Sequence, residues 1–134
     1  MFNPDDLHES NLSHIRSREV RVAYLYLIRI AQGLVGYRCK PNMKGVVRTF
    51  RYYVGAEQPF AFIVNADSLL FYFRKPAMSR FSLEDLSEIF DEVKVPRKDE
   101  ITVRVQKLTD AQTLMERIFG FRDAYHRSPP GRVR

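Results

Sequence analysis

Three short runs rich in β-branched and aromatic residues lie close together between residues 46 and 73, and they constrain the fold more than any other feature. This composition is typical of pleated strands. The intervening segments, 55–59 and 65–68, contain glycine, proline, asparagine and aspartate, which favour turns. We therefore predict three consecutive antiparallel strands over 46–54, 60–64 and 69–73.

A helix is predicted before these strands. Apolar residues there recur every three or four positions, the spacing of a helix packed on a core: Val20, Tyr24, Leu27, Ala31 and Leu34. Ser13 or Ser17 is expected to cap this helix, and glycines at 33 and 36 mark its end. The segment 40–45 contains Pro41 and Gly45 and is expected to form a turn.

Two helices and one strand are predicted after residue 76. A short acidic helix begins after Ser82 and is closed by Pro96, a strand with one apolar face covers 101–106, and a last helix runs from Thr109 to near Tyr125. The predicted order is α-β-β-β-α-β-α. This order indicates an α+β domain over residues 1–126, with helices packed on a mostly antiparallel four-stranded sheet, followed by a flexible basic tail over 127–134.

Three stretches of this pattern are shared with a known group of small domains. They are the aromatic stretch Pro59-Phe60-Ala61-Phe62-Ile63, its hairpin partner 69–74, and the strand 101–105 running into the helix 108–119. On these stretches, residues 45–119 resemble the MmcQ/YjbR-like α+β domains, although the chain has no Trp where that group often has one before its last strand. The resemblance implies a fold related to proteins proposed to bind nucleic acid, and it carries over no catalytic residues.

Patterns typical of catalytic, metal and cofactor sites are missing from the sequence. The three histidines, at 8, 14 and 126, lie near the two ends, and Cys39 has no partner at metal-ligand spacing. The six glycines are scattered and form no phosphate-binding loop. We therefore expect a non-catalytic domain without metal or cofactor, and a divergent catalytic site is the alternative that the sequence leaves open.

The chain is expected to be a cytoplasmic protein that does not enter a membrane. Its longest apolar stretch, 20–35, is interrupted by Arg21, Arg29 and Gln32 and is too short to cross a bilayer. The first residues lack the basic start and apolar run of a secretory signal. A single cysteine excludes an intrachain disulfide.

Positive charge is concentrated in one part of the chain. The formal net charge is +6, and no acidic residue occurs between Glu19 and Glu57, where seven Lys and Arg residues lie. Cations interleaved with aromatic rings are what a sheet surface uses to bind nucleic acid. The candidate nucleic-acid-binding residues are Arg38, Lys40, Lys44, Arg48, Arg51 and Tyr53. Because Arg48 and Arg51 differ by an odd number of positions, at most one of them can belong to a shared strand face.

The alternative function is a protein-interaction module, such as an inhibitor, an adaptor or a homodimer. The predicted acidic helix carries the candidate partner-binding residues Glu84, Asp85 and Glu88. Basic and acidic surfaces that are separated in this way can orient a protein partner or a second copy. Clusters of this size also occur on ordinary solvated surfaces, so charge alone does not decide between these interpretations.

Overall fold

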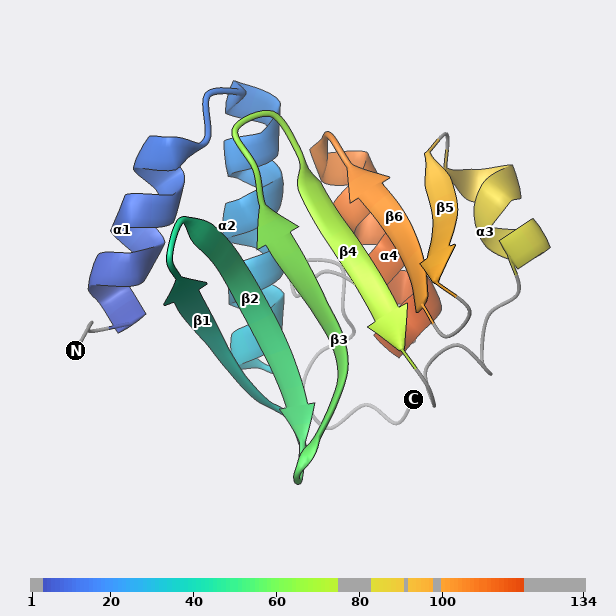
Figure 1. The fold of residues 1–134 in the computed structure, drawn as a ribbon, viewed down its shortest axis with the longest axis horizontal. Helices are drawn as coiled ribbons and strands as arrows, with labels where there is room; N and C mark the ends of the chain where they lie inside the picture. The colour runs from blue at the N-terminus through green and yellow to red at the C-terminus, as the bar shows by residue number, and fades with distance from the viewer. Residues whose placement is uncertain (1–3, 75–82, 91, 98–99, 120–134) are drawn as a thin grey trace, which may run out of the picture.

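The computed structural model describes residues 4–74, 83–90, 92–97 and 100–119, which form an α+β domain (Figure 1). The helices are α1 (Pro4–His14), α2 (Arg18–Gln32), α3 (Leu83–Ile89) and α4 (Leu108–Phe119). The strands are β1 (Arg38–Lys44), β2 (Val47–Val54), β3 (Glu57–Val64), β4 (Leu69–Arg74), β5 (Val93–Arg97) and β6 (Glu100–Val105).

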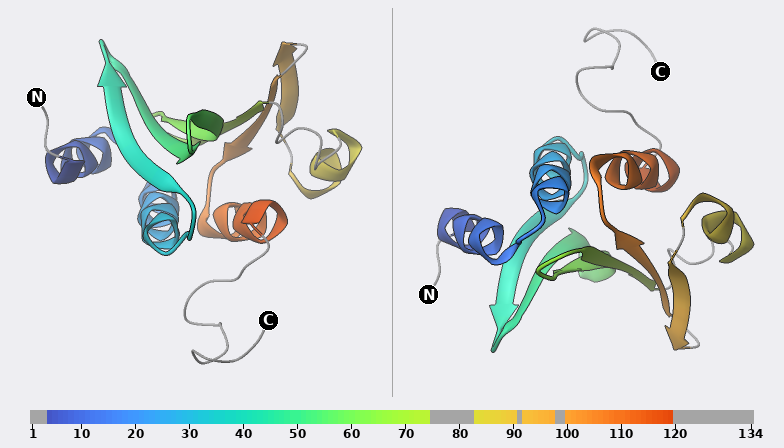
Figure 2. Two further views of the ribbon diagram at one scale, coloured as in Figure 1. Left: turned by 90° about the horizontal axis from the view of Figure 1, so that it is seen from below. Right: turned by 90° about the horizontal axis from the view of Figure 1, so that it is seen from above.

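All six strands belong to one antiparallel sheet in the order β1-β2-β3-β4-β6-β5. Helices α1, α2 and α4 cover one face of this sheet, and α3 lies beside β5 at the far end (Figures 1 and 2). Figure 2 shows that both edges of the sheet bend away from α2 and α4. The face opposite these helices is therefore concave, and no helix among the described elements lies in it.

The core lies between the sheet and the helices and is built from aromatic rings. Alternation along the strands places every second side chain on this inner face. Phe62 and Phe71 are cross-strand partners with ring centroids 5.0 Å apart, and the Tyr24 ring of α2 meets the Phe62 ring edge-on at 90°. Edge-on and offset ring pairs of this kind add to the free energy gained by burying apolar area.

Local sequence explains where the best-defined elements begin and turn. The Ser17 hydroxyl accepts a hydrogen bond from the Val20 amide at 3.2 Å and caps α2, which ends at Gly33 as predicted. In the β1–β2 and β2–β3 hairpins the first turn residue is Gly45 or Gly55, with φ of 62° and 61°. A side chain is disfavoured in this backbone conformation, so glycine sets both turns.

The α+β class and the three-strand meander are confirmed, but the sheet has six strands and the predicted order is wrong. The segment 40–45, predicted to be a turn, belongs mostly to β1, and Pro96, predicted to close a helix, lies within β5. Both are edge strands, where proline is tolerated because one side of the strand needs no donor. Helix α1 was not predicted.

Several predicted features lie outside the described residues: the Ser82 cap, the end of the last helix near Tyr125, the domain boundary at 126 and the basic tail 127–134. Within the described part of the chain, no helix combines the length and apolar character needed to cross a membrane.

Candidate nucleic-acid interface

The concave face of the sheet, called the open face below, collects side chains from all six strands. Its outward positions follow from the strand register, because cross-strand partners point to the same side. One such row runs across β1, β2, β3, β4, β6 and β5 and consists of Lys40, Arg51, Ala61, Tyr72, Thr102 and Lys94. Cations therefore lie at both ends of the row, and an aromatic ring lies near its middle.

Five of the six predicted nucleic-acid-binding residues lie on this face, at its β1–β2 end. Arg38 and Lys40 are both on β1, and their charged groups lie 4.8 and 5.5 Å from the centroid of the Tyr53 ring of β2. Cations held over an aromatic face are attracted to its electron-rich surface. Tyr53 thus positions two cations above the open face instead of presenting a bare ring.

A hollow of about 490 Å³, called the central hollow below, lies in the middle of the open face. Its cationic lining comes from Lys44, Arg51 and Arg74, and its carboxylate from Glu100. Ile63, Leu70 and Tyr72 add apolar and aromatic surface. Volumes of 300–1,000 Å³ with mainly apolar walls and a few placed polar groups are typical of ligand sites.

Arg51 is the most unusual group in the central hollow. Its Nε is buried, and its side chain makes no hydrogen bond or ion pair with any residue that the structure describes. A buried donor without a partner costs about 1–3 kcal/mol, and more when the group is charged. Arg51 therefore lines the hollow with a charged side chain that has no acceptor among the described residues.

The opposite side of the hollow combines a ring, a cation and a carboxylate. The Arg74 guanidinium carbon lies 5.1 Å from the centroid of the Tyr72 ring, and Arg74 Nε lies 3.4 Å from Glu100 Oε2. Glu100 is mostly buried, with 15% of its side chain exposed, whereas Arg74 is 51% exposed. This pair presents a donor and an acceptor next to a flat apolar surface.

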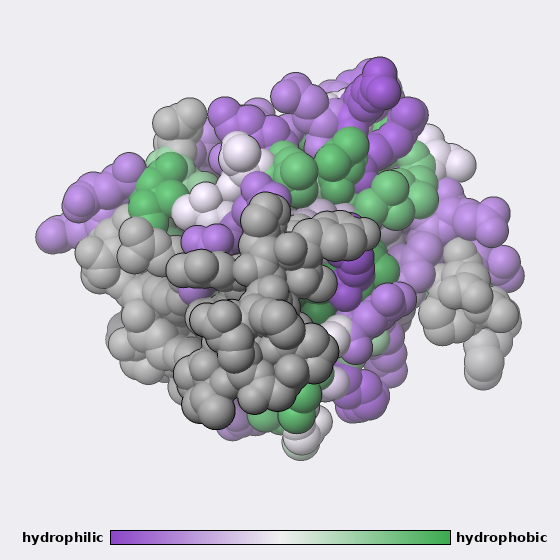
Figure 3. Space-filling view, turned by 180° about the vertical axis from the view of Figure 1, so that it is seen from behind, coloured by the Kyte–Doolittle hydropathy of each residue, from purple (hydrophilic) through white to green (hydrophobic). Residues whose placement is uncertain are grey.

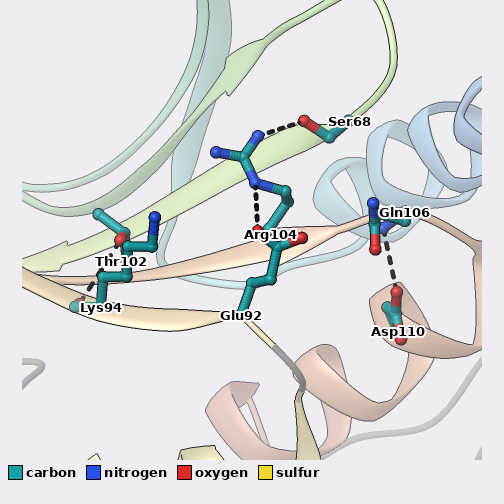
Figure 4. A network of polar contacts seen from close by, with 7 residues as sticks. All are labelled: Ser68, Glu92, Lys94, Thr102, Arg104, Gln106 and Asp110. Atoms are coloured by element: carbon teal, nitrogen blue, oxygen red, sulfur yellow. Dashed lines mark hydrogen bonds and ion pairs between the residues drawn. The ribbon is translucent and has the colours of Figure 1, made fainter.

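Arg104, which also points to the open face, is already engaged (Figure 4). Its Nη1 donates to Ser68 Oγ at 2.6 Å, and its Nε lies 3.5 Å from Glu92 Oε1. These contacts lock the β6 end of the sheet to the β3–β4 turn and to the start of β5. Arg104 is therefore a structural cation, in contrast to Arg51.

Arg48, the sixth predicted residue, lies on the helix-covered face. Its Nη1 donates to Ser10 Oγ at 2.6 Å and to Asn11 Oδ1 at 3.2 Å, both in α1. The Asn11 amide in turn donates to the Tyr24 hydroxyl at 2.9 Å. Burial raises the pKa of Tyr24 to about 12, although the Asn11 hydrogen bond and the Arg48 charge oppose the shift. Arg48 thus fastens α1 to the sheet and does not share the surface of the other five.

The acidic residues predicted to bind a partner lie on α3, at the opposite end of the sheet from β1 (Figure 1). Glu84 and Glu88 are exposed, and the side chain of Asp85 lies outside the described residues. The basic and acidic regions, which are separate along the chain, thus also lie at opposite ends of the sheet.

A smaller cavity of about 350 Å³ lies between α1, α2 and β1, and its lining includes His8 and Cys39. Burial raises the pKa of the Cys39 thiol to about 11, which disfavours a reactive thiolate. No group of three or more His, Cys, Asp or Glu side chains suited to a metal ion occurs among the described residues.

The side of the molecule opposite to the view of Figure 1 has a different character. Figure 3 shows hydrophilic and hydrophobic residues interspersed over the described part of that side. Arg18 and Arg29 lie on the exposed stripe of α2, together with Val22 and Leu25. These two arginines provide reference cations remote from the open face.

In comparisons with known proteins, no family model, curated protein or solved structure matches this chain. The resemblance to MmcQ/YjbR-like domains therefore stays a prediction, and functional inference depends on the geometry of the open face.

Proposed function

We propose that this domain binds nucleic acid, without catalysis, through the open face of its sheet. The observation that carries the proposal is the combination of Arg51, whose side chain has no partner among the described residues, with Lys44 and the Arg38–Lys40–Tyr53 group on one concave surface. Phosphates neutralise such cations, and the counterions released on binding supply affinity.

The chemistry of the face favours a single strand over a duplex. Tyr72, Leu70 and Ile63 offer apolar contact within the hollow, which bases can reach only when they are not stacked inside a helix. The Arg74 guanidinium over Tyr72 extends this surface, since guanidinium planes stack on unpaired bases as aromatic rings do.

Fluorescence anisotropy of labelled single-stranded and duplex oligonucleotides at several salt concentrations tests this proposal. We expect single strands to bind more tightly. Four cations of the face, Arg38, Lys40, Lys44 and Arg51, have no ion-pair partner among the described residues, so log affinity should fall with log salt at a slope of about −3, from ~0.7 per phosphate contact.

Two charge-reversal variants distinguish binding at the open face from a general effect of net charge. Arg51→Glu should weaken binding about tenfold or more, because hydrogen bonds to charged groups contribute about 1.5–3 kcal/mol each. Arg18→Glu on α2 changes the net charge equally and should leave affinity within about twofold of the wild type. Equal losses in the two variants would show that only net charge matters and would refute the assignment of this surface.

The alternative is a protein partner or a homodimer, which the exposed Glu84 and Glu88 at the far end of the sheet favour. A second copy could set its basic β1–β2 end against this acidic helix. Sedimentation at low and high salt tests the homodimer: a dimer that dissociates as salt rises and is lost in Glu84→Lys would favour the alternative. A monomer at all concentrations would exclude self-association.

A further inference from the structure

We propose that the central hollow takes one nucleotide unit, with its phosphate on Arg51 and Lys44 and its base over Tyr72. This inference rests on the proposed function and deepens it, because it names a mononucleotide-sized subsite within the nucleic-acid surface. The hollow has a volume of about 490 Å³, which is far more than a bare phosphate needs and lies in the range typical of small-ligand sites.

The arrangement of charge in the hollow matches the two ends of a nucleotide. Arg51 and Tyr72 belong to the same cross-strand row and are separated by Ala61, so their backbones lie two strand spacings, about 9–10 Å, apart. Within this part of the row a cation on β2 is therefore followed, two strands away on β4, by an aromatic ring. A nucleotide carries an anionic phosphate at one end and a flat base at the other.

Arg51 supplies the strongest requirement for a ligand. Its Nε–H is buried and has no acceptor among the described residues, and Lys44, which also lines the hollow, makes no ion pair with them. Guanidinium groups recognise phosphate oxygens in a fixed, often bidentate geometry. A phosphate held by the part of the Arg51 side chain that lines the hollow would neutralise the local excess of positive charge.

The far end of the hollow suits the edge of a base. Glu100 is held by Arg74 Nε at 3.4 Å and keeps 15% of its side chain exposed. A carboxylate accepts hydrogen bonds from ring and exocyclic N–H groups of bases, and a guanidinium donates to their carbonyl oxygens. Because Arg74 lies over the Tyr72 ring, the base would stack against this pair, with Glu100 at its edge.

The experiment measures binding of nucleoside 5′-monophosphates, uridine and inorganic phosphate to the full-length protein by NMR titration. We expect saturable binding of at least one monophosphate at millimolar concentration, with uridine and phosphate each binding at least about tenfold more weakly, since each lacks one set of contacts. Phosphate that binds as tightly as every monophosphate would reveal a simple anion site and overturn the proposal.

Variants assign the two ends of the site. Arg51→Met should abolish binding of the monophosphate and of phosphate, whereas Tyr72→Leu should weaken the monophosphate about tenfold and leave phosphate unchanged. Lys44→Ala gives a second test of the phosphate end that leaves the centre of β2 untouched. Arg18→Met is the matched control and should bind like the wild type. Unchanged monophosphate binding in both Arg51→Met and Lys44→Ala would overturn the proposal.

Competition between a monophosphate and an oligonucleotide tests the nucleotide subsite and the proposed function separately. A monophosphate that displaces a bound oligonucleotide supports both. Oligonucleotide binding that depends on Arg51 but is unaffected by saturating monophosphates would overturn the subsite and leave the nucleic-acid function standing. Monophosphate binding that depends on Arg51, with no oligonucleotide binding at low salt, would overturn the proposed function and leave the nucleotide site standing.

Discussion

The contributions of Arg48 and Arg51 to stability can be compared directly, because both residues lie on β2, both are partly buried, and they point to opposite faces of the sheet. Replacing each in turn by methionine removes the same charge and a side chain of similar length. The structure predicts opposite effects on the free energy of unfolding.

Arg48→Met removes hydrogen bonds to Ser10 and Asn11 and leaves the side-chain oxygen Oδ1 of Asn11, a residue that is only 1% exposed, without this donor. Losing a charged donor to a buried acceptor should lower the free energy of unfolding by about 2–3 kcal/mol. Arg51→Met removes no side-chain hydrogen bond to a described residue and relieves a buried, unpaired N–H. It should change stability by about 0 to 1 kcal/mol in the stabilising direction.

Urea unfolding followed by far-ultraviolet circular dichroism measures both values in a chain that has no Trp. The urea concentration at the unfolding midpoint should fall clearly for Arg48→Met and stay the same or rise for Arg51→Met. The dependence of the free energy of unfolding on urea concentration should be equal in the two variants. A loss of stability in Arg51→Met as large as that in Arg48→Met would refute the view that Arg51 is reserved for a ligand.

Two further predictions concern buried groups near α1 and β1. Because burial raises the pKa of Tyr24 to about 12, above the unfolded value, folding favours the neutral phenol; the stability this gives is complete below pH 10 and is lost as pH rises to 12. Between pH 10 and pH 12 the free energy of unfolding should therefore fall in the wild type by up to about 2.7 kcal/mol more than in Tyr24→Phe. Urea unfolding at each pH measures both values, and equal losses in the two proteins would contradict the burial of Tyr24. The pKa of Cys39, raised to about 11, should make its thiol react with a disulfide reagent at pH 8 about a hundredfold more slowly in the native protein than in urea, and equal rates would contradict its placement.

The elements that form the core were predicted correctly from the sequence. The two strands at the edges of the sheet were not predicted, because proline interrupts their sequence pattern. Helix α2 has a regular apolar periodicity, and strands β2, β3 and β4 are rich in β-branched and aromatic residues, because these elements form the core. Pro41 and Pro96 instead suggested a turn and a helix terminator, and only the position of β1 and β5 at the sheet edges explains why proline is accepted there.

Helix α1 was missed because its buried side includes polar groups. Asn11 is 1% exposed, and His8 lies 2.6 Å from the Tyr24 hydroxyl, so the inward face of α1 lacks a continuous apolar stripe. Such a helix packs by hydrogen bonds to Arg48 and Tyr24, which no local periodicity reveals.

The candidate site was predictable only for its β1–β2 part. Strand alternation placed Arg48 and Arg51 on opposite faces, and the structure shows that Arg51 is the one on the open face. Tyr72, Arg74 and Glu100 were not singled out, although alternation in 69–74 puts Tyr72 and Arg74 on one side. Their approach to Arg51 depends on the β3–β4 and β4–β6 pairings, which are long-range contacts.

The central claim, that the open face of the sheet is the nucleic-acid surface, is tested most directly by mapping backbone amide shifts of the ¹⁵N-labelled protein as a single-stranded oligonucleotide is added. The account predicts that the largest changes fall on β1, β2, β3, β4 and β6 around Arg51, Tyr72 and Thr102, while the exposed stripe of α2 stays unchanged. Changes centred on α2 or α4, or no changes at low salt, would contradict it.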